Sequence, residues 1–184
     1  LGLNYAEHVK EGGSDRDLPS HPVYFTKPTT TITGPYDPVL YHKATSRLDY
    51  EVELAFVIGK EGKDIPKEKA LDYIAGYMVF QDISARALQS QHLQWYRGKG
   101  QDTFAPMGPY LVTPDEVGDP GKLKIWCKVN GAMRQDANTG RQRPWRFGAV
   151  DGLSRPCDNA CVHPDCRSVG AFSGQRSFCC IVHG

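Results

Sequence analysis

The sequence predicts a β-rich α+β domain over residues 1–139, with its functional site on loops and at strand ends. Most segments are short runs of β-branched and aromatic residues closed by Gly or Pro, which is typical of strands. Helical segments are few, and neither sequence repeats nor the strand–helix alternation of a doubly wound sheet is found. A chain of 184 residues is long enough for one domain with a sizeable core.

Turn and helix-start residues mark several of these segments. A Pro in the first turn favours the helix that begins at Pro66, and Asn130-Gly131 predicts a two-residue hairpin turn. Residues 12–21 form a polar loop, either a lid or plain surface. We expect strands over residues 1–5, 22–28, 39–41, 49–58, 74–80, 110–113 and 123–129, and helical segments over 6–11, 66–74 and 83–91.

The strand expected over residues 49–58 carries two glutamates, Glu51 and Glu53, on one face, while its apolar residues face the core. Neighbouring carboxylates repel each other unless a cation lies between them, and oxygen ligands suit Mg²⁺, Mn²⁺ or Ca²⁺. The alternative is an exposed, solvated strand face. Asp82 follows the strand over 74–80, where it either caps the next helix or supplies a third carboxylate ligand.

Two further features suggest chemistry. His8 and Glu11 share a face if residues 6–11 are helical, and a carboxylate beside an imidazole favours a general base; a surface pair is the alternative. Lys99 lies in a Gly-flanked loop, from which a lysine can reach a pocket and stabilise an anionic oxygen, or simply be solvated.

Composition excludes some classes of partner. The net charge of +1 gives no electrostatic reason to expect nucleic acid or a membrane surface, and no apolar run approaches the ~20 residues of a membrane helix. The chain begins at Leu1, so we expect a fragment; any targeting signal would lie upstream of it, and cytoplasmic and mitochondrial locations are both open. Cys127 is the single cysteine before residue 140, which agrees with a reducing compartment.

Taken together, these segments resemble the fumarylacetoacetate hydrolase superfamily over about residues 1–139. The resemblance is to its small, C-terminal-domain-type members, closest to the eukaryotic domain-containing protein 2 branch, which is linked to oxaloacetate keto–enol tautomerisation. The motifs that carry it are Leu1-Gly2-Leu3-Asn4-Tyr5 with His8 and Glu11, Phe25-Thr26-Lys27, Gly34-Pro35, Asp49-Tyr50-Glu51-Val52-Glu53-Leu54, Gly76-Tyr77, Asp82-Ile83-Ser84-Ala85-Arg86, Gly98-Lys99, Asp102-Thr103-Phe104, Pro106-Met107-Gly108-Pro109, and Val129-Asn130-Gly131 with Gln135.

The resemblance implies a mixed β-roll, assembly as a homodimer, and a Mg²⁺- or Mn²⁺-dependent enzyme acting on 2-oxo or 1,3-diketo acids. The reaction would be C–C bond hydrolysis, oxaloacetate tautomerisation or decarboxylation through a metal-stabilised enolate. Carried over by position, the metal ligands are Glu51, Glu53 and Asp82, the catalytic residues are His8, Glu11 and Lys99, and the substrate-binding residues are Arg86 and Gln89.

The sequence departs from the family after Thr139, where the segment that closes the roll is missing. Residues 1–140 carry a net charge of −2, whereas residues 141–184 carry +3 and five of the six cysteines. We interpret residues 140–184 as a divergent Cys/Arg-rich tail, either frameshifted or unspliced sequence, or disordered. The tail also offers a zinc alternative in its Cys157, Cys161, His163 and Cys166.

Two hypotheses on function therefore remain for residues 1–139. The first is a metal-dependent hydrolase, tautomerase or decarboxylase of this superfamily. The second is a truncated, catalytically inactive relative that at most binds metal, because the closing part of the roll is absent from the sequence.

Overall fold

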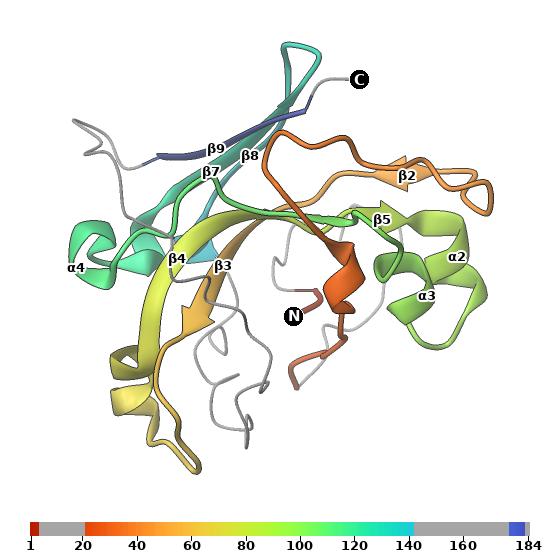
Figure 1. Cartoon of the computed structure of the whole chain (residues 1–184). Helices are drawn as coiled ribbons and strands as arrows, with labels where there is room; N and C mark the ends of the chain where they lie inside the picture. Colours follow the sequence, from red (N-terminus) through yellow and green to blue (C-terminus); the bar gives the residue numbers. More distant parts are fainter. Residues whose placement is uncertain (4–20, 142–176, 183–184) are drawn as a thin grey trace.

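The computed structural model describes residues 1–3, 21–141 and 177–182. Over these residues the chain is rich in short strands and poor in helix, as expected (Figure 1). The α-helices are α2 (Arg86–Gln91), α3 (Tyr96–Lys99) and α4 (Pro114–Val117). Single 3₁₀ turns or short 3₁₀ segments are η1 (Thr29–Thr31), η2 (Lys67–Tyr73), η3 (Pro120–Lys122) and η4 (Thr139–Arg141).

The strands pair in both directions. The antiparallel pairs are β3 (Val52–Ile58) with β4 (Ile74–Gln81), β2 (Leu48–Asp49) with β5 (Ser84–Ala85), and β7 (Lys124–Val129) with β8 (Ala132–Asn138). The parallel pairs are β1 (Ile32–Thr33) with β6 (Ala105–Pro106), and β7 with β9 (Ser177–Val182). The described strands form four small sheets, of which β8–β7–β9 is of mixed type, and β9 brings a piece of the Cys/Arg-rich tail alongside β7 (Figure 1).

The hairpin between β7 and β8 forms as the sequence predicts. Asn130 and Gly131 both have positive φ, at 50° and 81°, which is the conformation that a two-residue hairpin turn requires. The buried side chains of β7 are Ile125 and Cys127, so the alternation seen in the sequence marks the buried face. The prediction of a half-buried strand over residues 123–129 is confirmed.

The strand expected over residues 49–58 forms over Val52–Ile58 as β3, but the strand is interrupted at Tyr50 and Glu51, and Asp49 belongs to the separate strand β2. Residues before the break pair with β5, and residues after it pair with β4. The cause lies in β4, which ends at Gln81 before the chain bends at Asp82 and Ile83 towards β5. One partner strand therefore cannot follow residues 48–58 throughout.

Two expected helices differ in their type or bounds. The segment over 66–74 is the 3₁₀ segment η2, in which Ala70 is buried while Leu71 is 43% exposed, so no apolar stripe favours an α-helix. The helix expected over 83–91 begins only at Arg86, because Ser84 and Ala85 first pair with β2.

Three expected strands do not form as strands. The segments over 22–28 and 110–113 each contribute one isolated bridge, Gly2 with Val23 and Tyr77 with Val112, and residues 39–41 have no ladder partner among the described residues. Each segment has a proline at or next to at least one of its ends, and proline lacks the backbone N–H that a strand ladder needs. The segment expected over residues 1–5 is described only to Leu3, and the turn over 6–11 lies outside the described residues.

The core lies where the β3–β4 pair packs against the β7–β8 hairpin. Val52, Ile125 and Cys127 are buried together there, with Tyr50 and Leu54 packed against them. A second cluster beneath α2 contains Ile83, Ala85, Leu88 and Phe104. Apolar residues flanking Glu51 and Glu53 thus face the core, as the strand alternation predicts.

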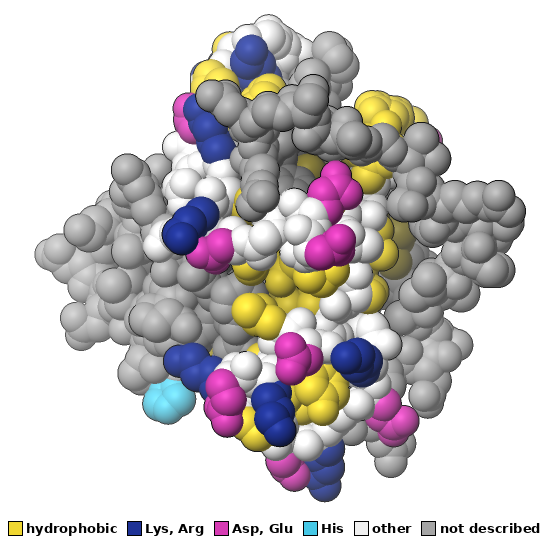
Figure 2. Space-filling view, turned by 90° about the vertical axis from the view of Figure 1, so that its left-hand side faces the viewer, with side chains coloured by type: hydrophobic (Ala, Val, Ile, Leu, Met, Phe, Trp, Pro, Cys, Tyr) yellow, Lys and Arg dark blue, Asp and Glu magenta, His cyan; other side chains and the backbone are white. Residues whose placement is uncertain are grey.

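On the surface, helices α2 and α3 lie on the right of the view in Figure 1, and α4 lies on the left. Figure 2 shows the face on the α4 side, where hydrophobic side chains at the centre have charged side chains above and below them. Within the ranges that the structure describes, no helix is both long enough and apolar enough to cross a membrane.

Candidate active site

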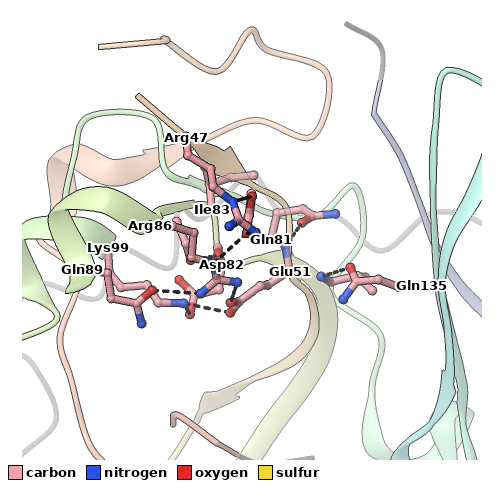
Figure 3. A network of polar contacts seen from close by, with 12 residues as sticks. Arg47, Glu51, Gln81, Asp82, Ile83, Arg86, Gln89, Lys99 and Gln135 are labelled. Atoms are coloured by element: carbon pink, nitrogen blue, oxygen red, sulfur yellow. Dashed lines mark hydrogen bonds and ion pairs between the residues drawn. The ribbon is translucent and has the colours of Figure 1, made fainter. Parts of the chain in front are cut away.

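The candidate site is built around the break between β2 and β3. Glu51 lies in this break, and Asp82 lies directly after β4. The backbone N–H of Asp82 donates to the carbonyl oxygen of Glu51 at 2.8 Å, so the two residues are joined through their backbones. Two carboxylates separated by 30 residues of chain are thereby brought to one place, as predicted for a shared site (Figure 3).

Helices α2 and α3 supply the basic side chains. Arg86 begins α2 and Lys99 ends α3. The two helices approach closely at Gly98, where an added Cβ would lie 2.6 Å from the Cβ of Gln89. Glycine at this position therefore allows the close approach of α2 and α3, whose Gln89 and Lys99 lie on the same side of the carboxylates in Figure 3.

Lys99 lies between the two carboxylates. Its Nζ donates to Glu51 Oε2 and to Asp82 Oδ2, each at 2.8 Å, and also lies 5.2 Å from the ring centre of Phe25. The Lys99 side chain is only 3% exposed. A buried ammonium group held by two carboxylates is a fixed positive charge, not a solvated surface lysine.

Arg86 binds carboxylates on the other side of Glu51. Its Nε donates to Asp49 Oδ2 at 2.8 Å, its Nη1 to Gln89 Oε1 at 2.8 Å, and its Nη2 contacts Glu51 Oε1. Burial alone would lower the pKa of Arg86, but the charges of Glu51 and Asp49 outweigh it and raise the pKa. Burial likewise favours a higher pKa for Asp49, whereas the hydrogen bonds from Arg86 and Arg47 lower it.

Sequence reasoning assigned no role to Lys27, although its motif was singled out. The Lys27 ammonium donates to the carbonyl oxygens of Lys99, Phe104 and Ile83 at 2.6, 2.8 and 3.2 Å. It also forms an ion pair with Asp82 Oδ1 at 2.8 Å. Burial lowers its pKa, while Asp82 raises it. The position of Lys27 in an otherwise apolar segment, between Phe25 and Pro28, could have indicated a buried lysine. No local pattern could identify its hydrogen-bond partners, because they lie far away in the sequence.

Glu53 lies near the other two carboxylates but makes no direct contact with their basic partners Lys27, Arg86 and Lys99. No hydrogen bond or ion pair joins its side chain to the residues that the structure describes. Burial first, and then the charges of Glu51 and Asp82, raise the pKa of Glu53 to about 8. Its carboxylate is thus the destabilised negative charge of the cluster.

The donor set was tested for its fit to a divalent cation. Asp82 Oδ1 is buried and lies 2.8 Å from the Lys27 ammonium, which also donates to three carbonyl oxygens. The carboxylate oxygens of Asp82, Glu51 and the destabilised Glu53 are the hard donors that a divalent cation prefers. As arranged, however, no group of three acidic, imidazole or thiol side chains among the described residues is close enough to coordinate a metal.

The structure thus brings together the predicted residues Glu51, Asp82, Arg86, Gln89 and Lys99. Glu53 lies in β3, two residues after Glu51, and the charges of Glu51 and Asp82 act on its pKa. The predicted pair His8 and Glu11 lies outside the described residues, and so do the tail residues Cys157, Cys161, His163 and Cys166. The boundary at residue 139 stays a prediction.

The chain is similar in sequence and in structure to several known enzymes. The chain is 48% identical over 139 residues to oxaloacetate tautomerase YisK of Bacillus subtilis, covering 75% of this chain and 46% of that protein. A solved 5-carboxymethyl-2-hydroxymuconate delta-isomerase of Mycobacterium smegmatis matches with a TM-score of 0.72 and 38% identity, over 83% of this chain and 59% of that one. A fumarylacetoacetate hydrolase of Exiguobacterium antarcticum matches with a TM-score of 0.70 and 39% identity, over 83% and 55%.

The family model for the fumarylacetoacetate (FAA) hydrolase C-terminal domain matches residues 1–147. The chain spans about half the length of the curated relatives it matches. The match includes the β2–β3 break, both site helices and the β7–β8 hairpin. The chain therefore belongs to the fumarylacetoacetate hydrolase C-terminal family.

Proposed function

We propose that this chain carries a Mg²⁺- or Mn²⁺-dependent site for a 2-oxo or 1,3-diketo acid, with oxaloacetate tautomerisation as its reaction. The observation that carries the proposal is the pair Glu51 and Asp82, both bound by the Lys99 ammonium at 2.8 Å, beside Glu53, whose pKa is raised to about 8 by burial and by the charges of the other two. The name of the Bacillus subtilis relative supports the choice of reaction.

The cation would be held by these three carboxylates. When bound, it would supply positive charge that polarises the 2-keto oxygen and favours the enolate. Lys99 now occupies the space between Glu51 and Asp82, so its ammonium has to turn away from one of them to admit a ligand. Asp82 Oδ1 forms an ion pair with the Lys27 ammonium at 2.8 Å, so it would have to share or exchange that contact to bind the cation.

The basic residues of the site would bind the substrate. Lys99, released from one carboxylate, would donate a hydrogen bond to the developing oxyanion. Arg86 is held by Asp49 and Glu51, which fixes the plane of its guanidinium, and its Nη1 now donates to Gln89. Exchanging Gln89 for a substrate carboxylate would keep that geometry and add a charge-assisted hydrogen bond.

Proton transfer falls to His8 and Glu11 in this proposal. In keto–enol exchange a proton leaves the carbon between the two carbonyl-bearing carbons of oxaloacetate, and the 2-oxygen gains one. His8, oriented by Glu11, would take the carbon proton and deliver it to the 2-oxygen, and the same transfer would run backwards in the reverse direction. The pair rests on its match to the family motif in the sequence.

One observation favours the alternative of a catalytically inactive relative. Glu51 and Asp82 are already neutralised by Lys99, Arg86 and Lys27, all at ion-pair distance. A closed ion cluster of this kind is stable without a metal. In that case the chain would bind Mn²⁺ weakly or not at all, and no turnover would follow.

The test compares Glu53→Ala with His8→Ala. Mn²⁺ binding is followed by electron paramagnetic resonance, and keto–enol exchange of oxaloacetate by its ultraviolet absorbance. The proposal expects Glu53→Ala to lose both, and His8→Ala to lose turnover while keeping the Mn²⁺ affinity of the unmodified chain. Equal loss of Mn²⁺ affinity in both variants would contradict this division of roles, and an unmodified chain that binds no Mn²⁺ would favour the inactive relative.

A further inference from the structure

Two glutamine side chains accept hydrogen bonds from the backbone of Glu51 and Val52, the two residues where the β2–β3 break ends. The N–H of Glu51 donates to Gln81 Oε1 at 3.0 Å, and the N–H of Val52 donates to Gln135 Oε1 at 2.9 Å (Figure 3). Gln81 ends β4, and Gln135 lies in β8. Neither glutamine has a part in the substrate or metal chemistry proposed above.

These amides replace strand partners. Residues up to Asp49 pair with β5, and residues from Val52 pair with β4, so the chain changes partner at Glu51. Backbone N–H groups in a buried region need acceptors, and Gln81 and Val52 are only 2% and 5% exposed. The two side-chain oxygens supply those acceptors at the point where the ladder is interrupted.

The two glutamines are also connected to each other. Gln81 Nε2 donates to the Sγ of buried Cys127 at 3.6 Å, and Cys127 is the register partner of Gln135 in the β7–β8 hairpin. One clamp therefore joins β4, the hairpin and the backbone of Glu51. The two amides come from separate sheets and bind consecutive residues, whereas satisfying a single unpaired strand edge would need only one of them.

A shift of this backbone would affect the side-chain and backbone contacts of Glu51. Its Oε1 contacts Arg86 and its Oε2 accepts from Lys99 at 2.8 Å, so both carboxylate oxygens are committed to different helices. Its carbonyl oxygen accepts from the N–H of Asp82. A rotation of the peptide between Glu51 and Val52 would change all three contacts together.

We propose that Gln81 and Gln135 are positioning residues for Glu51, setting the direction of its carboxylate between Arg86 and Lys99. The role in metal binding rests on the proposed function, whereas the effect on the contacts of Glu51 does not. Gln135 was singled out in the sequence as part of the Val129-Asn130-Gly131 motif, and the clamp gives it a physical role.

The experiment replaces Gln135 and follows three signals in the full 184-residue chain. Gln135→Met keeps the length of the side chain but removes the amide, and Gln135→Glu keeps an acceptor oxygen. Gln94→Met, at an exposed glutamine, is the matched control. The signals are the exchange rate of the Val52 amide hydrogen, the nuclear magnetic resonance signal of the Lys99 ammonium group, and Mn²⁺ affinity.

We expect Gln135→Met to speed exchange at Val52 by about tenfold or more, since a buried N–H loses its acceptor. The Lys99 ammonium signal should shift or broaden, and the dissociation constant for Mn²⁺ should rise about tenfold, with Gln135→Glu and Gln94→Met close to the unmodified chain. Faster exchange at Val52 with an unchanged Lys99 signal would overturn the proposal, and so would unchanged exchange.

Failure of the proposed function gives a different pattern. If the unmodified chain binds no Mn²⁺, the metal role is lost, and the Lys99 signal alone decides whether Gln135 positions Glu51. Should Gln135→Met fail to fold, Gln135→Asn is the second variant, because it keeps the amide but shortens its reach. In Gln135→Asn the Lys99 ammonium signal should shift or broaden as expected for Gln135→Met. A signal like that of the unmodified chain would overturn the proposal.

Discussion

The β7–β8 hairpin and the β2–β3 break use charged residues in opposite ways. In the hairpin, Lys124 Nζ lies 3.1 Å from Asp136 Oδ2, and both side chains are about half exposed, at 51% and 48%. At the break, Lys99 Nζ lies 2.8 Å from Glu51 Oε2, and their side chains are 3% and 12% exposed. Similar distances therefore describe a solvated pair in one region and a desolvated pair in the other.

This difference separates what stabilises the fold from what forms the site. The hairpin is local in sequence, with its turn at Asn130 and Gly131 and its apolar side chains at alternate positions. The break depends on contacts between residues far apart in the chain, such as Lys99 with Glu51 at a separation of 48 residues. Substitutions in the two regions should consequently differ in size, in pH dependence and in their response to metal.

The largest effect is expected at Lys99. In Lys99→Met the carboxylates of Glu51 and Asp82 lose the ammonium group that lies between them, which should cost about 3–5 kcal/mol of unfolding free energy without metal. Denaturant unfolding in the presence of a chelator measures this, with Lys63→Met at an exposed position as the control. A Lys99→Met chain as stable as the control would show that the pair is not desolvated.

Glu53 should give the metal-free chain an unusual dependence on pH. Its pKa is raised from 4.5 to about 8, so between these values the unfolded chain ionises Glu53 while the folded chain keeps it protonated. The folded state then binds more protons, and stability falls as pH rises from about 4.5 to about 8. Thermal unfolding across this range should show the decline, and Glu53→Gln should flatten it. The same slope in both proteins would refute the assignment to Glu53.

A smaller effect is expected at the hairpin turn. Asn130 has a φ of 50°, which a residue with an ordinary side chain adopts at a cost of about 1–2 kcal/mol. Asn130→Ala should therefore lower the unfolding free energy by roughly 1 kcal/mol, and Asn130→Gly should not. Both variants should keep the Mn²⁺ affinity of the unmodified chain. Loss of that affinity in Asn130→Ala would show that the hairpin turn and the site are coupled.

The smallest effect is expected for the exposed hairpin pair. Lys124→Met removes the ion pair with Asp136, and an exposed pair of this kind contributes about 0–1 kcal/mol. The change should shrink further at high salt. Chemical denaturation at two salt concentrations checks both points. A loss as large as that in Lys99→Met would remove the contrast between the two regions.

The sequence predicts local features of this fold better than long-range ones. The hairpin at Asn130-Gly131 and the strand over residues 74–80 follow from turn chemistry and apolar runs, and both are confirmed, although the strand is only partly buried and Ala75 is exposed. The break at Glu51 was not predicted, because it arises where β4 ends and the chain changes partner. No pattern within residues 49–58 carries that information.

The same limit applies to the site. Motif order was sufficient to single out Glu51, Asp82 and Lys99, which the structure joins directly. The ammonium of Lys27 and the amides of Gln81 and Gln135 were not assigned, since their partners are backbone groups in distant segments. Side chains that recognise a distant backbone leave no periodic signal in the sequence.

The most direct test of a cation site at Glu51, Glu53 and Asp82 is the melting temperature of the chain with Mn²⁺, and then with Mn²⁺ and oxalate, a mimic of a 2-oxo acid enolate. A ligand that binds only the folded state must raise the melting temperature. The site described above predicts a cooperative transition that Mn²⁺ raises, that oxalate raises further, and that Glu53→Ala leaves unresponsive. A cooperative transition unchanged by Mn²⁺ would contradict it and leave a closed ion cluster in place of a metal centre.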